Sequence, residues 1–282
     1  VVKGRKTDKE KFNGAEETYT VECMMHDKKA LQGGTSHYFG DGFARAFDIT
    51  FTGKDNQLHH PYQTSWGVST RMIGGIIMTH GDNNGLVLPP RIAPIQVVVI
   101  PVAQHKEGVL EANRAVMERL KAAGFRVKMD ESDNSPGWKF AEYEMKGVPL
   151  RLELGPKDME KNQCVLVRRD SGEKSFVSLD NIEKTVADML DSIHDGLYQR
   201  AKKNLEENTY PCTTLEEVKE KMAARGGFAE AMWCGDEACE IRMKEEAGVT
   251  SRCIPFEQKH LGDTCAVCGK PAKHMVVWGV AY

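Results

Sequence analysis

The 282-residue sequence lacks several features that would place it in common functional classes. It has no apolar run long enough to span a bilayer, and residues 1–11 carry too many charges for a signal peptide. A net charge of −3 excludes bulk attraction to polyanions, such as that of a nonspecific DNA coat. Neither an internal repeat nor a low-complexity segment is present. These absences predict a cytoplasmic globular protein that binds neither membranes nor DNA.

A Walker-type phosphate loop and a Ser/His/Asp arrangement are also missing, but cysteine is not. Among the eight cysteines, four form two close pairs in the last fifty residues: Cys234, Cys239, Cys265 and Cys268. Spacings of four and two intervening residues let thiolates converge on one tetrahedral ion, whereas free thiols or an unrelated disulfide pair are the alternatives. Because four thiolates leave no open coordination position, we expect a structural zinc rather than a catalytic one.

The first ninety residues have the pattern of an antiparallel sheet with one helix. Residues 16–25 alternate, with Tyr19, Val21 and Cys23 on one side, and residues 47–51 alternate again, so both segments predict strands. Between them, residues 32–37 predict a glycine-containing loop. A buried helix within residues 67–81 and a strand-like segment at 86–91 follow. We expect part of a domain here, not a complete one.

The rest of the chain predicts an α/β domain and a smaller tail. Residues 95–101, 125–128, 149–154 and 164–168 read as strands, and helical patterns lie within residues 109–123 and 138–146. A long amphipathic helix runs from about residue 181 to 205, and a second begins near Leu215. We therefore predict a combined α/β and α+β fold with domains at residues 1–93, 94–200 and 201–282.

Two polar groupings predict ligand binding. Arg71 stands at the start of the apolar helix after small residues, where orphan N–H groups and the helix dipole favour anions such as phosphate. The alternative is a buried helix whose first arginine merely reaches solvent. Gln32, Thr35 and His37 crowd one segment and could bind a small polar ligand, although a local hydrogen-bonding histidine is the alternative.

Several separated strings then resemble one family. QGGTSH (32–37), TSWGVSTR (64–71), MTHGD (78–82) and LVLPPR (86–91) are similar to the third signature motif of class II aminoacyl-tRNA synthetases, in the version of the prolyl-tRNA synthetases. The resemblance continues through GWKF (137–140), EMKGVPLR (144–151) and GPKD (155–158). The cysteine-bearing tail and terminal Tyr282 resemble the archaeal and eukaryotic type, in which the terminal carboxylate folds toward the catalytic domain. The fold implied is an antiparallel catalytic domain, an anticodon-binding domain and a zinc-bearing domain.

The resemblance implies roles for five residues in the activation of L-proline by ATP. Arg71 would bind the triphosphate tail and pack near adenine, a task that suits a planar, permanently charged fork. Gln32 and Thr35 would contact the nucleotide, Gln32 would also help to place magnesium, and Ser69 would lie beside ATP. His37 would touch proline. Arg71 and His37 form the implied catalytic pair.

The resemblance also implies that Glu144, Arg151 and Lys157 read the anticodon of tRNA(Pro). That anticodon ends in two guanines, whose edges accept hydrogen bonds from Arg or Lys and donate to a carboxylate. An ordinary surface charge is the alternative for each residue. The family further implies a homodimer.

The chain departs from the family because two of the three class II motifs are missing. We expect both to precede Val1, so these 282 residues by themselves would bind tRNA, and ATP weakly, but would not activate proline. A catalytically silent RNA-binding protein that kept the anticodon and zinc modules is the alternative function. A synthetase for threonine, glycine or histidine would share the fold but fits the strings less well.

Overall fold

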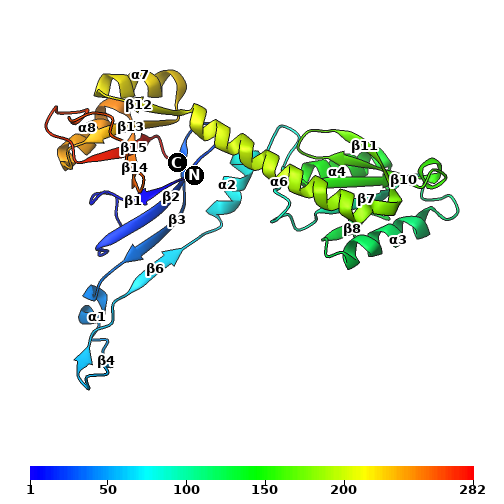
Figure 1. The fold of residues 1–282 in the computed structure, drawn as a ribbon, viewed down its shortest axis with the longest axis horizontal. Coiled ribbons are helices and arrows are strands. Elements are labelled where there is room, and N and C mark those ends of the chain that lie inside the picture. The colour runs from blue at the N-terminus through cyan, green and yellow to red at the C-terminus, as the bar shows by residue number, and fades with distance from the viewer. The chain divides into compact units, whose positions relative to one another are not determined.

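The computed structural model describes residues 1–282 and divides into two compact units, each considered by itself (Figure 1). Unit 1 combines Val1–Thr79 with Lys202–Tyr282, and unit 2 is His80–Ala201. The predicted segments 1–93 and 201–282 therefore contribute mainly to the same unit, and residues 80–93 belong to unit 2. The reason is strand pairing between residues far apart in the sequence.

Unit 1 contains one eight-stranded sheet in the order β12-β13-β15-β14-β1-β2-β3-β6. Strand β1 pairs antiparallel with both β2 and β14, so the early and late segments form a continuous sheet. Helices α7 (Leu215–Arg225) and α8 (Glu237–Ala247) accompany the late strands. The strands are β1 (Val2–Arg5), β2 (Glu17–Met24), β3 (Ala30–Tyr38), β6 (Thr64–Gly67), β12 (Thr209–Cys212), β13 (Phe228–Trp233), β14 (Thr250–Pro255) and β15 (His274–Gly279).

Four local predictions for residues 1–93 are wrong. Residues 32–37 lie within β3 rather than in a loop. The segment 47–51 follows helix α1 (Gly42–Ala46), and only β4 (Phe51–Thr52), paired with β5 (Leu58–His59), is extended. Residues 86–91 form no strand. Helix α2 (Arg71–His80) exists, but Gly75 is its only buried residue.

The strand predicted at residues 16–25 is confirmed as β2, but its buried face is the polar one. Thr18, Thr20, Glu22 and Met24 are buried, whereas Tyr19, Val21 and Cys23 are only half-buried. Glu22 is completely enclosed and pairs with Lys6 and Arg252. The sequence pattern predicted the period correctly but did not specify the buried side, which depends on charged partners elsewhere in the chain that compensate the burial of Glu22.

Unit 2 is a five-stranded mixed sheet in the order β11-β10-β9-β7-β8. Strands β7 (Val97–Pro101), β8 (Val127–Met129) and β9 (Leu150–Leu154) are parallel, and β10 (Gln163–Arg168) and β11 (Lys174–Ser178) are antiparallel. Helices α3 (Val109–Ala122) and α6 (Ile182–Glu207) supply core residues to one face, and α4 (Pro136–Met145) packs on the other. The α/β alternation and the long helix are confirmed.

Short helical turns complete unit 2, namely α5 (Pro156–Met159) after β9 and a 3-10 turn at Leu179–Asn181 before α6. Glycine ends α4, because Gly147 adopts φ +70° and an added Cβ there would lie 2.6 Å from Leu86. None of the helices, α6 included, combines the length and the apolar character that crossing a lipid bilayer requires.

Candidate functional site

A β-bulge at Gly33 brings the predicted nucleotide residues to one face of the sheet in unit 1. Glu22 pairs with Gln32, but Val21 pairs with Gly34, so Gly33 is an extra residue in β3. Thr35 and His37 stand opposite Thr20 and Thr18. Because directly opposed residues share a face, Gln32, Thr35 and His37 all lie on the side of Thr18, Thr20 and Glu22. In a regular strand Gln32 would point the other way.

His37 is held at both ring nitrogens. The Thr18 Oγ1 lies 3.0 Å from its Nδ1, and the Thr35 Oγ1 lies 3.0 Å from its Nε2. The Phe12 ring packs 4.9 Å from the imidazole, centroid to centroid. Burial lowers the pKa of His37 below its usual 6.5, so the ring is neutral at physiological pH. A neutral, doubly anchored ring forms a fixed wall for a small ligand.

Arg71 is the first residue of α2, which follows β6 at the edge of the sheet. Its own N–H donates to the Ser69 Oγ at 3.3 Å, which fixes the turn into the helix. Helix α2 packs beside the bulge, since an added Cβ at Gly33 would lie 3.3 Å from the Met72 Sδ and 3.1 Å from the Cys23 Sγ. Cys23 belongs to the opposite face from Glu22, so the helix supports the sheet from behind. The Arg71 side chain is exposed and able to receive an anion.

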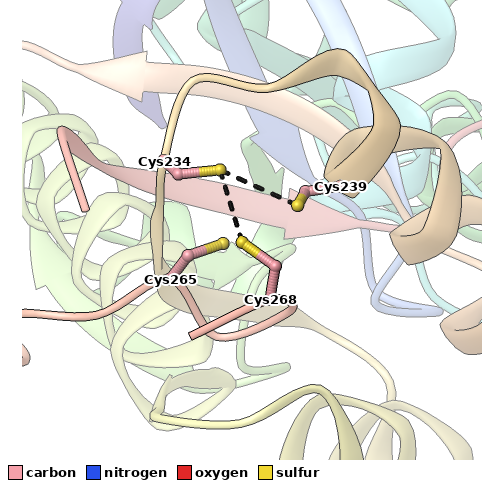
Figure 2. Close-up of side chains that lie close together, drawn as sticks. All are labelled: Cys234, Cys239, Cys265 and Cys268. Atoms are coloured by element: carbon pink, nitrogen blue, oxygen red, sulfur yellow. Dashed lines mark hydrogen bonds between the residues drawn. The ribbon is translucent and has the colours of Figure 1, made fainter. Parts of the chain in front are cut away.

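The four predicted thiols meet at one point (Figure 2). Cys234 follows β13, Cys239 lies in α8, and the other pair, Cys265 and Cys268, precedes β15. All four sulfurs lie within 4.8 Å of one another, and the Cys234 Sγ is 3.7 Å from both the Cys239 and the Cys268 Sγ. A tetrahedral zinc with Zn–S bonds of about 2.3 Å requires sulfurs about 3.8 Å apart. The cluster therefore fits zinc.

In unit 2, Glu144 and Arg151 line one cavity of about 370 Å³. The Asn84 Nδ2 donates to the Glu144 carboxylate at 3.0 Å. The Arg151 guanidinium lies 4.1 Å above the Phe140 ring, and its Nε donates to Glu153 at 2.9 Å. A stacked guanidinium beside a half-buried carboxylate offers the donors and acceptors that a guanine edge requires.

Lys157 does not line this cavity. It lies exposed in α5, which follows the C-terminal end of β9, whereas Arg151 is near the beginning of that strand. The structure thus brings together two of the three predicted anticodon residues.

Three neighbours that shape this cavity are not among the predicted anticodon residues. Asn84 orients Glu144, and Arg169 closes the rim by a bidentate salt bridge of 2.6 and 2.7 Å to Asp82. The turn 82–85 carried the signal for Asn84, because Asp and Asn in a turn cap backbone N–H groups and present side chains locally. Nothing in the sequence signalled the pairing of Arg169 with Asp82.

Tyr282 lies against the turn between β2 and β3. Its N–H donates to the Ala30 carbonyl at 3.3 Å, and its hydroxyl donates to Asp27 at 2.5 Å. These contacts attach Tyr282 to the early segment of unit 1, and the position of its carboxylate stays a prediction.

Two models of known protein families match this chain, one in each unit. Residues 96–189 match the family model of an anticodon binding domain, and residues 215–282 match that of the prolyl-tRNA synthetase C-terminal region. The whole chain is 61% identical to a proline–tRNA ligase of Ruminiclostridium cellulolyticum, 59% identical to one of Clostridium novyi and 58% identical to a proline–tRNA ligase 2 of Bacillus cereus. It spans 59% of the length of each of these relatives. The archaeal and eukaryotic type, which some bacteria share, stays a prediction.

Proposed function

Because the chain belongs to the prolyl-tRNA synthetase family, we propose that the whole protein activates L-proline with ATP and transfers it to tRNA(Pro). The observation that supports this most strongly is the shared face of Gln32, Thr35 and His37, which a silent RNA-binding protein has no use for. The homodimer, the cytoplasmic location and the three domain boundaries belong to the same proposal.

The chemistry proposed for unit 1 is electrostatic positioning. Gln32 and Thr35 hold the nucleotide on the sheet, and the Arg71 fork binds its phosphate tail, while the neutral His37 ring limits the space left for proline. The proline carboxylate then attacks the α-phosphorus, and pyrophosphate leaves. Magnesium, partly placed by Gln32, neutralises phosphate charge when bound. Residues outside this chain complete the clamp on the α-phosphate.

The proposed role of unit 2 is anticodon reading. Glu144 accepts from a guanine N–H and Arg151 donates to a second guanine edge, while Lys157 contacts the RNA at the far end of β9. Zinc bound by the four thiolates holds the loops after β13 and before β15 together and takes no part in the reaction.

Proline-dependent exchange between ATP and pyrophosphate in the full-length protein tests the proposal. Arg71→Ala should lower the exchange rate by about 100-fold or more and leave tRNA binding intact, because a transition-state charge loses its partner. Arg71→Lys should restore only part of the rate, since lysine lacks the fork. Arg114→Ala, in the exposed pair with Glu131, is the matched control and should exchange normally.

The competing readings give different results in the same assay. A silent RNA-binding protein would bind tRNA(Pro) and show no exchange. A synthetase for threonine, glycine or histidine would exchange with that amino acid instead of proline. Sedimentation of the full-length protein at twice its monomer mass would support the homodimer.

A further inference from the structure

Phe176 is a conspicuously exposed aromatic residue in unit 2. Its side chain is 70% exposed, although it lies in the middle of the regular strand β11. Strand β11 forms the edge of the sheet, where an exposed apolar side chain increases the risk of aggregation. An exposed aromatic ring on an edge strand is also available for contact with a ligand.

Strand register places Phe176 on the same sheet face as Arg151. Val167 pairs with both Arg151 and Lys174, and Val165 pairs with both Glu153 and Phe176. These two rows are two residues apart on each strand, so all of their side chains share one face. On this face α4 packs over β7, and Phe140 lies against Arg151, whereas Lys174 and Phe176 of β11 are exposed.

The row next to Phe176 already borders the cavity that holds Glu144. Arg151, Val167 and Lys174 line that cavity, and Lys174 is exposed. The surface therefore continues from the cavity, across the row that contains Lys174, to the exposed ring of Phe176. The Lys174 ammonium is the cation on this side of the ring. Single-stranded RNA is bound in this way, with one base held at its edge and the next stacked on an aromatic ring beside a basic group.

We propose that Phe176 is a stacking platform for an unpaired base adjoining the nucleotide that enters the Glu144 and Arg151 cavity. This inference rests on the anticodon-reading role proposed for unit 2 and extends it to a further nucleotide. Phe176 adds affinity with little base selectivity, because every base has a π-face, whereas the cavity residues select by hydrogen bonds.

Binding of a synthetic tRNA(Pro) anticodon stem–loop to the 282-residue chain, followed by fluorescence anisotropy, tests this. Phe176→Ala should weaken binding by about 5-fold or more, which is the loss expected for one stacked base. Phe176→Tyr should bind within about 2-fold of the original chain, because the ring is kept. Tyr198→Ala removes an aromatic that is 60% exposed from α6, on the other side of the sheet, and should bind normally.

Abasic stem–loops locate the stacked nucleotide. Each loop base is removed in turn. At one position, removal of the base should weaken binding to the original chain but not to Phe176→Ala, because both changes remove the same contact. Additive losses at every position, or unchanged binding by Phe176→Ala, would overturn the inference. If Phe176→Ala instead abolished self-association of the chain, the face would be a protein interface.

The same measurements separate this inference from the proposed function. If the original chain fails to bind the stem–loop, anticodon reading by unit 2 is wrong. If Glu144→Ala and Arg151→Ala lose binding while Phe176→Ala retains it, anticodon reading stands and only the stacking role of Phe176 fails.

Discussion

At the scale of single residues, the least expected feature is a buried ionic group in unit 1. The Glu22 Oε1 accepts from the Lys6 Nζ at 2.8 Å and from the Thr20 hydroxyl at 2.7 Å, while its Oε2 lies 3.5 Å from the Arg252 Nε. The Glu22 and Lys6 side chains are 0% and 2% exposed. Nearby, the buried Glu240 accepts from Thr7 and Ser251. These groups join the early strands to β14 and α8.

Glu22→Gln should strongly destabilise unit 1. The amide removes the negative charge that compensates two buried cations, and breaking a buried pair in this way costs about 3–5 kcal/mol in the free energy of unfolding. Urea denaturation followed by tryptophan fluorescence measures the change.

Lys184→Ala is the control for Glu22→Gln, because Lys184 and Asp188 form a pair that is 77% and 63% exposed. Its loss should change the free energy of unfolding by less than about 0.5 kcal/mol. Equal effects of the two substitutions would contradict the importance of burial.

His37 predicts a pH dependence of stability. Burial holds its pKa below 6.5 in the folded chain, so the unfolded chain binds more protons between the folded pKa and 6.5. Stability from this residue is complete above 6.5 and is lost as the pH falls through that window. NMR titration should give a His37 midpoint below 6.5, and His37→Gln should reduce the loss of stability between about pH 7 and pH 5. A midpoint above 6.5 would contradict the prediction.

At the scale of elements, two local features, a β-bulge and a cluster of four thiols, shape unit 1. The bulge at Gly33 re-aims Gln32 toward Thr35 and His37, and it does so where α2 packs closely behind β3. The thiol cluster ties the loop after β13 and the start of α8 to the loop before β15. In both places a few residues determine the local arrangement of the neighbouring strands.

Zinc removal should lower the stability of unit 1. Cys265→Ser or a strong chelator should reduce the melting temperature by about 10 °C or more, because a structural metal contributes several kcal/mol to folding. Elemental analysis should find one zinc per original chain. Cys253→Ser alters a buried cysteine outside the cluster and should leave the zinc content unchanged. Full zinc content in Cys265→Ser would refute the four-thiolate site.

At the scale of the whole molecule, the chain folds as one continuous and one discontinuous unit. Unit 2 occupies a single segment with its own core, whereas unit 1 needs residues from both sides of it. Strand β1 lies between β2 and β14, so neither half of unit 1 completes the sheet without the other.

Residues 80–201 expressed alone should therefore fold, and residues 1–79 alone should not. In the short fragment β1 would have a free edge and Glu22 would lose Arg252. Amide NMR spectra report the difference: the signals should be well dispersed for residues 80–201 and poorly dispersed for residues 1–79. A dispersed spectrum of 1–79 would show that the late strands are dispensable.

The sequence was most informative where the physical cause is local. Thiolate chemistry and spacing identified the four cysteines, helical periodicity identified α6, and apolar runs identified β7, β8, β9 and β10 of unit 2 but not β11. It failed where the partner is distant. The alternation in β2 was correct, but its buried side depends on Lys6 and Arg252, and no pattern in β2 encodes them.

By itself, the sequence determined the periods of β2 and α6, the thiol set and the family strings, because these depend on neighbours along the chain. Tertiary structure alone decided that Gly33 is a bulge, that the early and late segments share a sheet, and that Glu144 and Arg151 line one cavity without Lys157. A bulge reverses which side chains share a face, and strand pairing joins residues that the chain separates. Both depend on register in three dimensions, which periodicity in one dimension does not specify.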